Sequence, residues 1–448
     1  MNWIRLATIL VCTRGAAVFG QCDTTFLEAP DLTALSYFGK SMAESGGVLM
    51  VGAPGSTDAA WPSGRVFEFN HVGGRWQSVS VIDDPGANTR FGHSLSLEGD
   101  RLVAGAPYEG PSSKMGAAHI YRRDPAGWTR EAVLQAPDGG ASDRFGWSVA
   151  IAGDTVAVGA PFRREIEDES GAVYFFRRSG VSWRFDGKVV HDTVQWRNYF
   201  GYHVRLLNAN SCVITAHGAD EQRGALMWFV RDGGEWQLRQ KITNPDADGL
   251  GLALDATGDV LATTGGSFSQ QTSAVFLYRF DGAEWSLLHT MTAEFSWRLG
   301  REVAIDSGRV LVGAPNTLRS TRRVGQAHLF EYSTSDWRHE AFILADPYRR
   351  FENLGESVVF SGGAPLVGAA SDARIGPGSG AVAELTLPLV CTCPGDFNRD
   401  GISDLFDWLD YLSAFAAGDP RADIDLDGEL DSIDFLNFQL DFEAGCWG

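Results

Sequence analysis

The chain has 448 residues, a net charge of −20, 53 glycines and 14 tryptophans. A chain this acidic has no excess of basic residues from which to build a nucleic-acid-binding face, so that class of partner is excluded. The charge is concentrated at one end, because residues 394–448 contain 14 acidic and 2 basic residues.

Residues 1–20 predict a secretory signal peptide, with Arg5 before the apolar segment Leu6 to Cys12 and a cleavage site at Gly20. A mis-assigned start codon is the alternative. A lipoprotein is disfavoured because Gln21, rather than a small residue, precedes the next cysteine. No later apolar run approaches the ~18–20 residues that span a bilayer. We therefore expect an extracellular protein, secreted or tethered at the cell surface, without a transmembrane segment.

A phrase that begins with Phe-Gly or Leu-Gly recurs every 49 to 55 residues. Its clearest copy, Phe145 to Pro161, holds two alternating apolar runs around the hairpin signal Gly153-Asp154. Each unit continues with a third strand and a fourth strand near a tryptophan. Stacked blades bury their faces and a closed ring has no exposed edge, so the repeats predict a seven-bladed β-propeller over residues 21–390. The copies begin at Phe38, Phe91, Phe145, Phe200, Leu250, Leu299 and Leu354.

The Phe-Gly and Gly-Ala-Pro phrases resemble the FG-GAP repeats of integrin-α-type propellers over roughly residues 24–388. The resemblance implies a protein or glycan ligand at the upper face, where the loops between second and third strands meet the loops between blades; solvated, variable loops are the alternative. Integrin-type calcium loops are replaced here by short links such as Ala152-Gly153-Asp154, so we expect no metal in the propeller. Candidate contact residues on this face are Trp61, Tyr108, Phe162, Arg163, Arg164, Trp196, Phe268, Trp297, Arg319, Arg322, Arg323 and Tyr348.

Positions that the blades share are expected to be structural. His119 and His328 occupy equivalent third-strand positions, and the small residues of Gly-Ala-Pro are expected on the strand nearest the axis. One repeated tryptophan anchor comprises Trp76, Trp128, Trp183, Trp236, Trp285 and Trp337. No H-E-x-x-H, G-x-S-x-G or P-loop motif occurs, so we do not expect an enzyme.

Two segments of the acidic tail have the spacing of EF-hand-like calcium loops. Each alternates oxygen ligands around a glycine at position 6, as a hard cation with six or more oxygen ligands requires, so two Ca²⁺ ions are predicted. The first loop comprises Asp396, Asn398, Asp400, Ile402 (through its carbonyl), Asp404 and Asp407, and the second comprises Asp423, Asp425, Asp427, Glu429, Asp431 and Asp434. A disordered acidic tail is disfavoured because the carboxylates are interleaved with apolar helix faces.

Each loop runs into a predicted amphipathic helix, Leu405 to Ala417 and Ile433 to Phe442. The apolar face of the first helix is expected to comprise Phe406, Leu409, Leu412 and Phe415.

Two such loops, each followed by one helix, resemble a type I dockerin module over residues 391–448. The CPGDFN opening and AGC ending are those of the bacterial GC-type subtype. The resemblance implies a cohesin-like partner held by loop positions 10 and 11, which are Leu405, Phe406, Ser432 and Ile433. These residues differ from the Ser-Thr pair of clostridial dockerins and between the two halves, so no particular cohesin follows. The predicted fold class is mainly β, a propeller followed by a small α-helical dockerin.

The last repeat lacks a fourth strand. Phe26 to Asp31 matches the fourth strand Val133 to Asp138, so the N-terminal segment is expected to complete blade seven. Superposing the repeats places Cys22 and Cys391 two residues apart in one hairpin, which favours a Cys22–Cys391 disulfide.

Cys393 and Cys446 flank the tail and are expected to pair, and Cys212 is expected to be a buried free thiol. The competing pattern joins Cys22 to Cys393 and Cys391 to Cys446.

The favoured function is a secreted, non-catalytic binding or adhesion protein tethered through its dockerin. The alternatives are a component, enzymatic or not, of an extracellular polysaccharide-degrading complex, by analogy with what dockerins carry, and a structural surface-layer component.

Overall fold

The computed structural model describes residues 21–22, 24–27, 29, 35–55, 64–84, 86, 89–110, 115–165, 169–191, 196–267, 272–292, 300–315, 318–319, 322–323, 325–333, 336–344, 353–371, 379–385, 391–392, 397, 405–419, 422 and 430–444.

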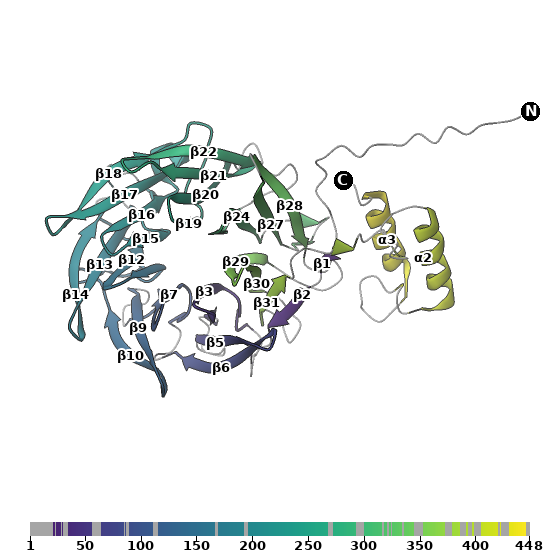
Figure 1. Cartoon of the computed structure of the whole chain (residues 1–448), viewed down its shortest axis with the longest axis horizontal. Helices are drawn as coiled ribbons and strands as arrows, with labels where there is room; N and C mark the ends of the chain where they lie inside the picture. Colours follow the sequence, from purple (N-terminus) through teal and green to yellow (C-terminus); the bar gives the residue numbers. More distant parts are fainter. Residues whose placement is uncertain are drawn as a thin grey trace, which may run out of the picture.

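Seven four-stranded antiparallel sheets stand as blades around one axis (Figure 1). Blade one is β3 (Ser41–Ser45), β4 (Val48–Ala53), β5 (Arg65–Val72) and β6 (Arg75–Asp83). Blade two is β7 (Leu95–Glu98), β8 (Arg101–Ala106), β9 (Ala117–Asp124) and β10 (Gly127–Leu134). Blade three is β11 (Ser148–Ala152), β12 (Thr155–Ala160), β13 (Ala172–Ser179) and β14 (Ser182–Val189). Blade four is β15 (Val204–Asn208), β16 (Ser211–Ala216), β17 (Ala225–Asp232) and β18 (Glu235–Ile242).

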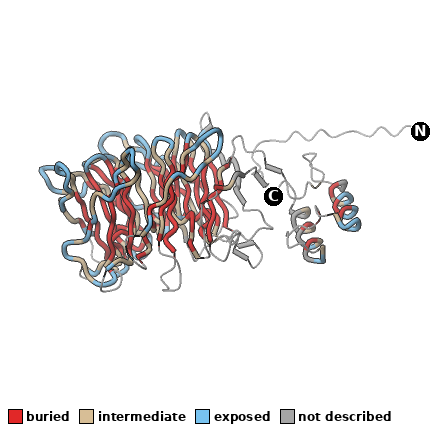
Figure 2. The backbone as a smooth tube through the Cα atoms, turned by 90° about the horizontal axis from the view of Figure 1, so that it is seen from below, coloured by how far each residue is buried: buried red, intermediate tan, exposed pale blue. Residues whose placement is uncertain are grey.

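Blade five is β19 (Leu254–Thr257), β20 (Val260–Ser267), β21 (Thr272–Phe280) and β22 (Trp285–Thr292). Blade six is β23 (Glu302–Asp306), β24 (Arg309–Ala314), β27 (Gln326–Ser333) and β28 (Asp336–Leu344), with the small ribbon β25 (Leu318–Arg319) and β26 (Arg322–Arg323) between its second and third strands. Blade seven is β29 (Leu354–Ser361), β30 (Ala364–Ala369), β31 (Ala381–Leu385) and β2 (Thr24–Leu27). Figure 2 shows buried strands through the middle of the ring and exposed turns at its two ends.

The ring is closed by the N-terminal segment, as predicted. Strand β2 pairs antiparallel with β31, with Phe26 opposite Ala383 and Leu27 opposite Val382. A parallel bridge between Phe38 and Gly380 then joins blade seven to blade one. The closure therefore combines residues from the two ends of the propeller in one sheet, which gives blade seven the same four strands as the other blades.

The Phe-Gly phrase joins each blade to the one before it. In five described cases its Phe or Leu forms a parallel bridge to the glycine that opens the preceding blade's third strand, as in Gly116–Phe145 and Gly171–Phe200. At Gly116 a Cβ atom would lie 2.0 Å from the carbonyl oxygen of Phe145, so no other residue fits. We call this contact the Phe–Gly junction.

The glycine positions of Gly-Ala-Pro admit no larger residue, for the same reason. A Cβ atom on Gly105 would meet the carbonyl oxygen of Gly146 at 2.1 Å, and one on Gly159 would meet that of Gly201 at 2.1 Å. These glycines lie on second strands, whereas the first strands line the axis. The expectation that the Gly-Ala-Pro strand lies nearest the axis is therefore wrong, because the crowding comes from the next blade.

The repeated tryptophans and histidines are packing residues, as predicted. Trp236 of blade four stacks on Phe175 of blade three, with ring centroids 3.9 Å apart. Trp128 donates its Nε1–H to Glu68 of the preceding blade at 3.0 Å. His119 and His328 are 1% and 0% exposed. Each anchor thus increases the apolar area buried between neighbouring blades.

Three helices are described: α1 (Ala219–Gln222), a single turn in blade four, and α2 (Leu405–Ala417) and α3 (Ser432–Ala444) outside the ring (Figure 1). Within the described ranges, no helix has the length and apolarity to cross a bilayer. Helices α2 and α3 share a small aromatic core, in which Tyr411 stacks on Phe438 with ring centroids 4.0 Å apart.

The buried face of α2 differs from the expected one. Leu409 and Leu412 are 50% and 36% exposed, whereas Trp408, Tyr411 and Phe415 pack into the core. These three aromatic residues are spaced to lie on one face and offer more apolar area than the leucines, so the helix turns them inward. The Phe406 side chain lies outside the described residues.

The geometry of the Phe–Gly junction predicts a large cost for Gly116→Ala. Gly116 and Gly47 both have positive φ (+88° and +82°), but a Cβ on Gly47 would meet nothing within 4 Å. Gly47→Ala should therefore lower the free energy of unfolding by only about 1–2 kcal/mol, from backbone strain. Gly116→Ala should lower it by roughly 3 kcal/mol or more, because backbone must also move. Guanidinium denaturation of both variants measures the difference, and equal losses would show that the junction is not close-packed.

The backbone supports the predicted Cys22–Cys391 disulfide. Strand β1 (Gln21–Cys22) pairs antiparallel with β32 (Cys391–Thr392), and Cys22 is directly opposite Cys391. Directly opposed Cα atoms lie about 4.5–5.5 Å apart, within the range of a disulfide. Cys212 is a buried free thiol, and Cys393 and Cys446 lie outside the described residues.

Peptide mapping of the secreted protein without reductant should recover Cys22 linked to Cys391. Recovery of Cys22 linked to Cys393 would favour the competing pattern, and a free Cys22 would refute covalent closure of the ring.

Candidate functional site

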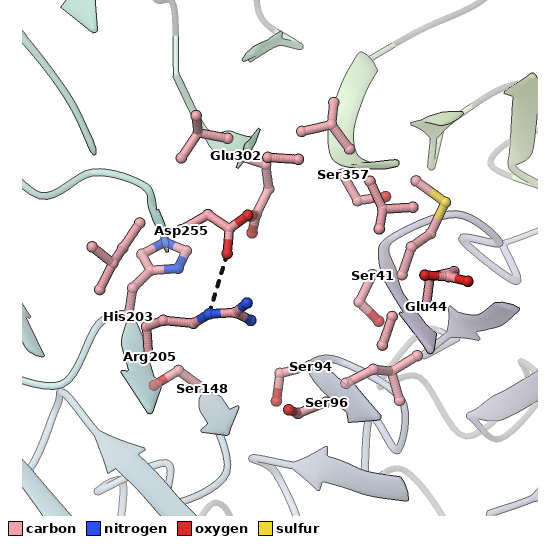
Figure 3. Close-up of a pocket in the computed structure, with 18 of the residues that line it drawn as sticks. Ser41, Glu44, Ser94, Ser96, Ser148, His203, Arg205, Asp255, Glu302 and Ser357 are labelled. Atoms are coloured by element: carbon pink, nitrogen blue, oxygen red, sulfur yellow. Dashed lines mark ion pairs between the residues drawn. The ribbon is translucent and has the colours of Figure 1, made fainter. Parts of the chain in front are cut away.

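A cavity of about 540 Å³ runs along the axis of the propeller (Figure 3). First strands from all seven blades line it, so the ring itself creates the cavity. Its size is within the range of small-molecule binding sites. Inward-facing polar side chains include Ser94, Ser148, His203, Arg205 and Asp255 (Figure 3).

The residue after each Phe-Gly or Leu-Gly lies where the chain enters the first strand, at one mouth of this cavity. Six of the seven residues at this position line the cavity and are polar or aromatic: Lys40, His93, Trp147, Tyr202, Arg301 and Glu356; the seventh is Leu252. The sequence analysis missed this set because it treated the whole phrase as structural. The signal was present: one position varies in chemistry within a phrase that is otherwise constant.

Charged residues from three blades meet at this mouth. Lys40 of blade one forms an ion pair with Glu356 of blade seven, and the Arg301 Nε of blade six lies 3.8 Å from the same carboxylate. Burial would raise the pKa of Glu356, but the Lys40 and Arg301 charges outweigh it and lower that pKa. Glu356 is therefore an anion that holds two cations.

Below this mouth, a ring of serines links the blades. Ser41 Oγ donates to the carbonyl oxygen of Gly92 at 2.8 Å, and Ser148 Oγ donates to that of Gly201 at 2.8 Å. Blades four, five and six depart from this pattern with His203, Ala253 and Glu302 at the serine position, and His203 and Glu302 are titratable.

Burial moves the pKa values of these two titratable residues. Burial raises the pKa of Glu302 from 4.5 to about 8, while Lys40 acts in the opposite direction. Burial, together with the nearby His217, lowers the pKa of His203 to about 3, so its imidazole is neutral. Farther along the cavity, Arg205 Nε lies 3.2 Å from Asp255 Oδ1 (Figure 3). Carboxylate, imidazole, guanidinium and hydroxyl groups thus face one cavity from different blades.

The predicted upper-face residues divide into two groups. Tyr108 and Phe162 lie beside this mouth, in contact with Arg144, whose guanidinium carbon is 5.1 and 4.3 Å from the two ring centroids. Arg163 instead bonds to Asp143 at 2.6 Å and to Glu165 at 2.8 Å, which makes it a structural ion pair. Trp196 is 58% exposed.

Arg164 is exposed. The remaining upper-face residues are not placed. Trp61, Phe268, Trp297 and Tyr348, and the side chains of Arg319, Arg322 and Arg323, lie outside the described residues.

In the tail, the described calcium-loop residues are those next to the helices. Asp407 and Asp434, the twelfth positions of the two loops, are both 0% exposed, and the exposed Asp431 donates its backbone N–H to Asp434 Oδ2 at 2.9 Å. Among the described residues no cluster of three metal-ligating side chains occurs. The other ligands lie outside the described residues: Asp396, Asn398, Asp400, Ile402, Asp404, Asp423, Asp425, Asp427 and Glu429.

The predicted partner-binding residues begin the two helices. Leu405 and Phe406 are the first residues of α2, and Ser432 and Ile433 are the first of α3. Ser432 is exposed, and the side chains of the other three residues are not described.

Comparisons with known proteins agree with the architecture. A sequence model of the FG-GAP repeat matches residues 81–121 and 128–176. A candidate 6-phosphogluconolactonase from Bacteroides uniformis has a similar structure, with 10% identity and a TM-score of 0.50 over 69% of this chain and 86% of that one. Another, from Bacteroides fragilis, has 14% identity and a TM-score of 0.50 over 74% and 94%. At these identities only the fold is shared. The chain is therefore a seven-bladed propeller that contains FG-GAP repeats.

The raised pKa of Glu302 predicts a pH-dependent stability that glutamine would remove. Below pH 4.5 the folded and unfolded states both hold the proton. Between 4.5 and about 8 only the folded state holds it, so the free energy of unfolding falls as the pH rises, and the full loss is reached above 8. Glu302→Gln should thus be more stable than the parent at pH 8–9, on the order of 1–3 kcal/mol after allowance for solvent in the cavity, and similar at pH 4.5.

Chemical denaturation at both pH values checks this, with the exposed Glu284→Gln as the control. A variant whose stability follows the parent's at every pH would show that Glu302 ionises normally.

Proposed function

We propose that this protein is a secreted, non-catalytic binding protein. Its propeller presents a ligand-binding cavity mouth, and its C-terminal module, of the dockerin kind, holds two Ca²⁺ ions and tethers the propeller through a cohesin-like partner at a cell surface or in an extracellular assembly. The observation that carries the tether is the burial of Asp407 and Asp434 at equivalent positions of two repeated acidic loops.

Two buried carboxylates require compensation. Removing a carboxylate from water is strongly unfavourable unless a charge or several donors replace the water. The tail offers little positive charge, with 2 basic against 14 acidic residues in 394–448. Asp434 also accepts the N–H of Asp431, which caps α3, but a cap needs no burial. A divalent cation held by the loop oxygens would neutralise these carboxylates, and the repeated spacing supports calcium.

The exposed leucines support a partner surface on the helices. Leu409 and Leu412 follow Leu405 by one and two turns on α2, and Leu436 follows Ser432 by one turn on α3. The three described leucines are 50%, 36% and 54% exposed. Because residues at this spacing share a helix face, Leu405 lies on the same face as two exposed leucines of α2, and Ser432 lies on the same face as one exposed leucine of α3. Such exposed leucines favour contact with another protein.

Calorimetric titration of the full chain with Ca²⁺ should detect two bound ions. Asp407→Asn should remove one ion and lower α-helix content, because the loop loses a charged ligand. Asp410→Asn removes the same charge from the exposed side of the same helix and should leave both ions bound. Equal binding by the two variants would contradict the assignment of the loops.

Retention on the secreting cells tests the tether. The full chain should stay in the surface fraction in calcium and be released by a chelator or by the Asp407→Asn, Asp434→Asn double variant. A chain lacking 391–448 should be folded but soluble in the medium. If that chain stays bound, the attachment site lies in the propeller.

A further inference from the structure

Arg90 and Arg144 occupy the same position in blades two and three, immediately before Phe-Gly. Both have left-handed backbone conformations (φ 56° and 55°), which are unfavourable for residues with a side chain. Each one begins a tight turn: the backbone N–H of His93 donates to the carbonyl oxygen of Arg90, and that of Trp147 donates to the carbonyl oxygen of Arg144, both at 3.1 Å. Tyr37, Tyr199 and Asn353 adopt this conformation at the same position of other blades. The left-handed conformation at this position is therefore a feature of the repeat, and only the arginine side chains distinguish blades two and three.

Aromatic rings hold the two guanidinium groups. The guanidinium carbon of Arg90 lies 4.4 Å from the ring centroid of Tyr108. That of Arg144 lies 4.3 Å from Phe162 and 5.5 Å from Trp147. Such cation–π contacts orient an arginine without neutralising its charge. We call Arg90, Tyr108, Arg144, Trp147 and Phe162 the arginine patch.

Charged groups and polar atoms in and beside the patch have no partner in the described part of the chain. Within the described part of the chain, neither Arg90 nor Arg144 forms an ion pair, in contrast to Arg163 nearby. Buried nitrogens without a hydrogen-bond partner also gather here: Arg90 Nε, His93 Nδ1 and His217 Nδ1. Buried polar atoms are normally paired, so these three indicate a missing partner.

The patch continues into the axial cavity. His93 and Trp147 line the cavity, with their ring centroids 4.5 Å apart, and Tyr202 lies 5.6 Å from Trp147. On the opposite side of the mouth, Lys40 and Arg301 share the single carboxylate of Glu356. The mouth therefore carries an excess of positive charge in a protein whose net charge is −20.

We propose that this mouth binds an acidic saccharide. The anionic groups of the saccharide would contact Arg90 and Arg144, and a sugar ring would lie against Trp147. Guanidinium groups suit carboxylate and sulfate oxygens, and an aromatic face suits the apolar face of a pyranose. A cavity of about 540 Å³ fits a few sugar units. This inference rests on the proposed binding function and names its ligand class.

The test is calorimetry of the full chain, in calcium, with a hyaluronan hexasaccharide. The controls are the same hexasaccharide with its carboxylates methyl-esterified, a sulfated chondroitin hexasaccharide and a hexa-aspartate peptide. Both acidic saccharides should bind, more weakly as salt rises, and esterification should reduce the affinity at least about tenfold.

Arg90→Asn and Arg144→Asn should each lose at least about tenfold in affinity for the acidic hexasaccharides. Asparagine tolerates the left-handed conformation, so both variants should keep the parent's melting temperature. Arg184→Asn, on the exposed outer strand β14, removes an equal charge and should bind as the parent does.

Equal affinity for the esterified saccharide, tighter binding of hexa-aspartate or binding unaffected by both variants would overturn the proposal, as would no binding at all. If these arms fail while Ca²⁺ still binds and the chain stays tethered, only the ligand class is wrong; loss of the calcium response instead refutes the proposed tether.

Discussion

The propeller depends on the close approach of backbone at the Phe–Gly junction. In five of the described junctions the Phe or Leu of one blade bridges the glycine that opens the third strand of the previous blade, as at Gly116 and Phe145. No Cβ atom fits between them, and the adjoining Gly-Ala-Pro glycine is equally close to the next blade. The repeated phrase is therefore the seam between blades, and the buried Phe side chain fills the space beside each seam.

This seam also explains where function can evolve. Because the glycines and the buried aromatic residue leave little freedom, variation is confined to residues that face away from the seam. The residue after Phe-Gly faces the cavity, and the one before it is held in a left-handed turn beside the mouth. Seven blades thus supply two sets of side chains on a rigid scaffold, and their chemistry is free to differ from blade to blade.

The two modules separate two kinds of charge. Cations gather at the mouth, where Lys40 and Arg301 share one carboxylate and two arginines lie on aromatic rings. The acidic residues are densest in the tail, where Asp407 and Asp434 are buried. The proposed site for an anionic ligand and the proposed site for a divalent cation therefore lie in separate parts of the chain, which limits their mutual screening at physiological salt.

The sequence alone determined the repeat, the number of blades, the short links within them and the completion of blade seven by residues near Phe26, because each follows from local patterns of glycine, alternation and spacing. The helix positions in the tail followed from the same kind of pattern. The sequence did not determine which side of α2 faces inward. Leu409 and Trp408 are both apolar, and only packing against α3 decides which of them is buried. The residues of the axial cavity could not be predicted from the sequence either. Lys40 and Glu356 are separated by 316 residues, and only closure of the ring brings them together.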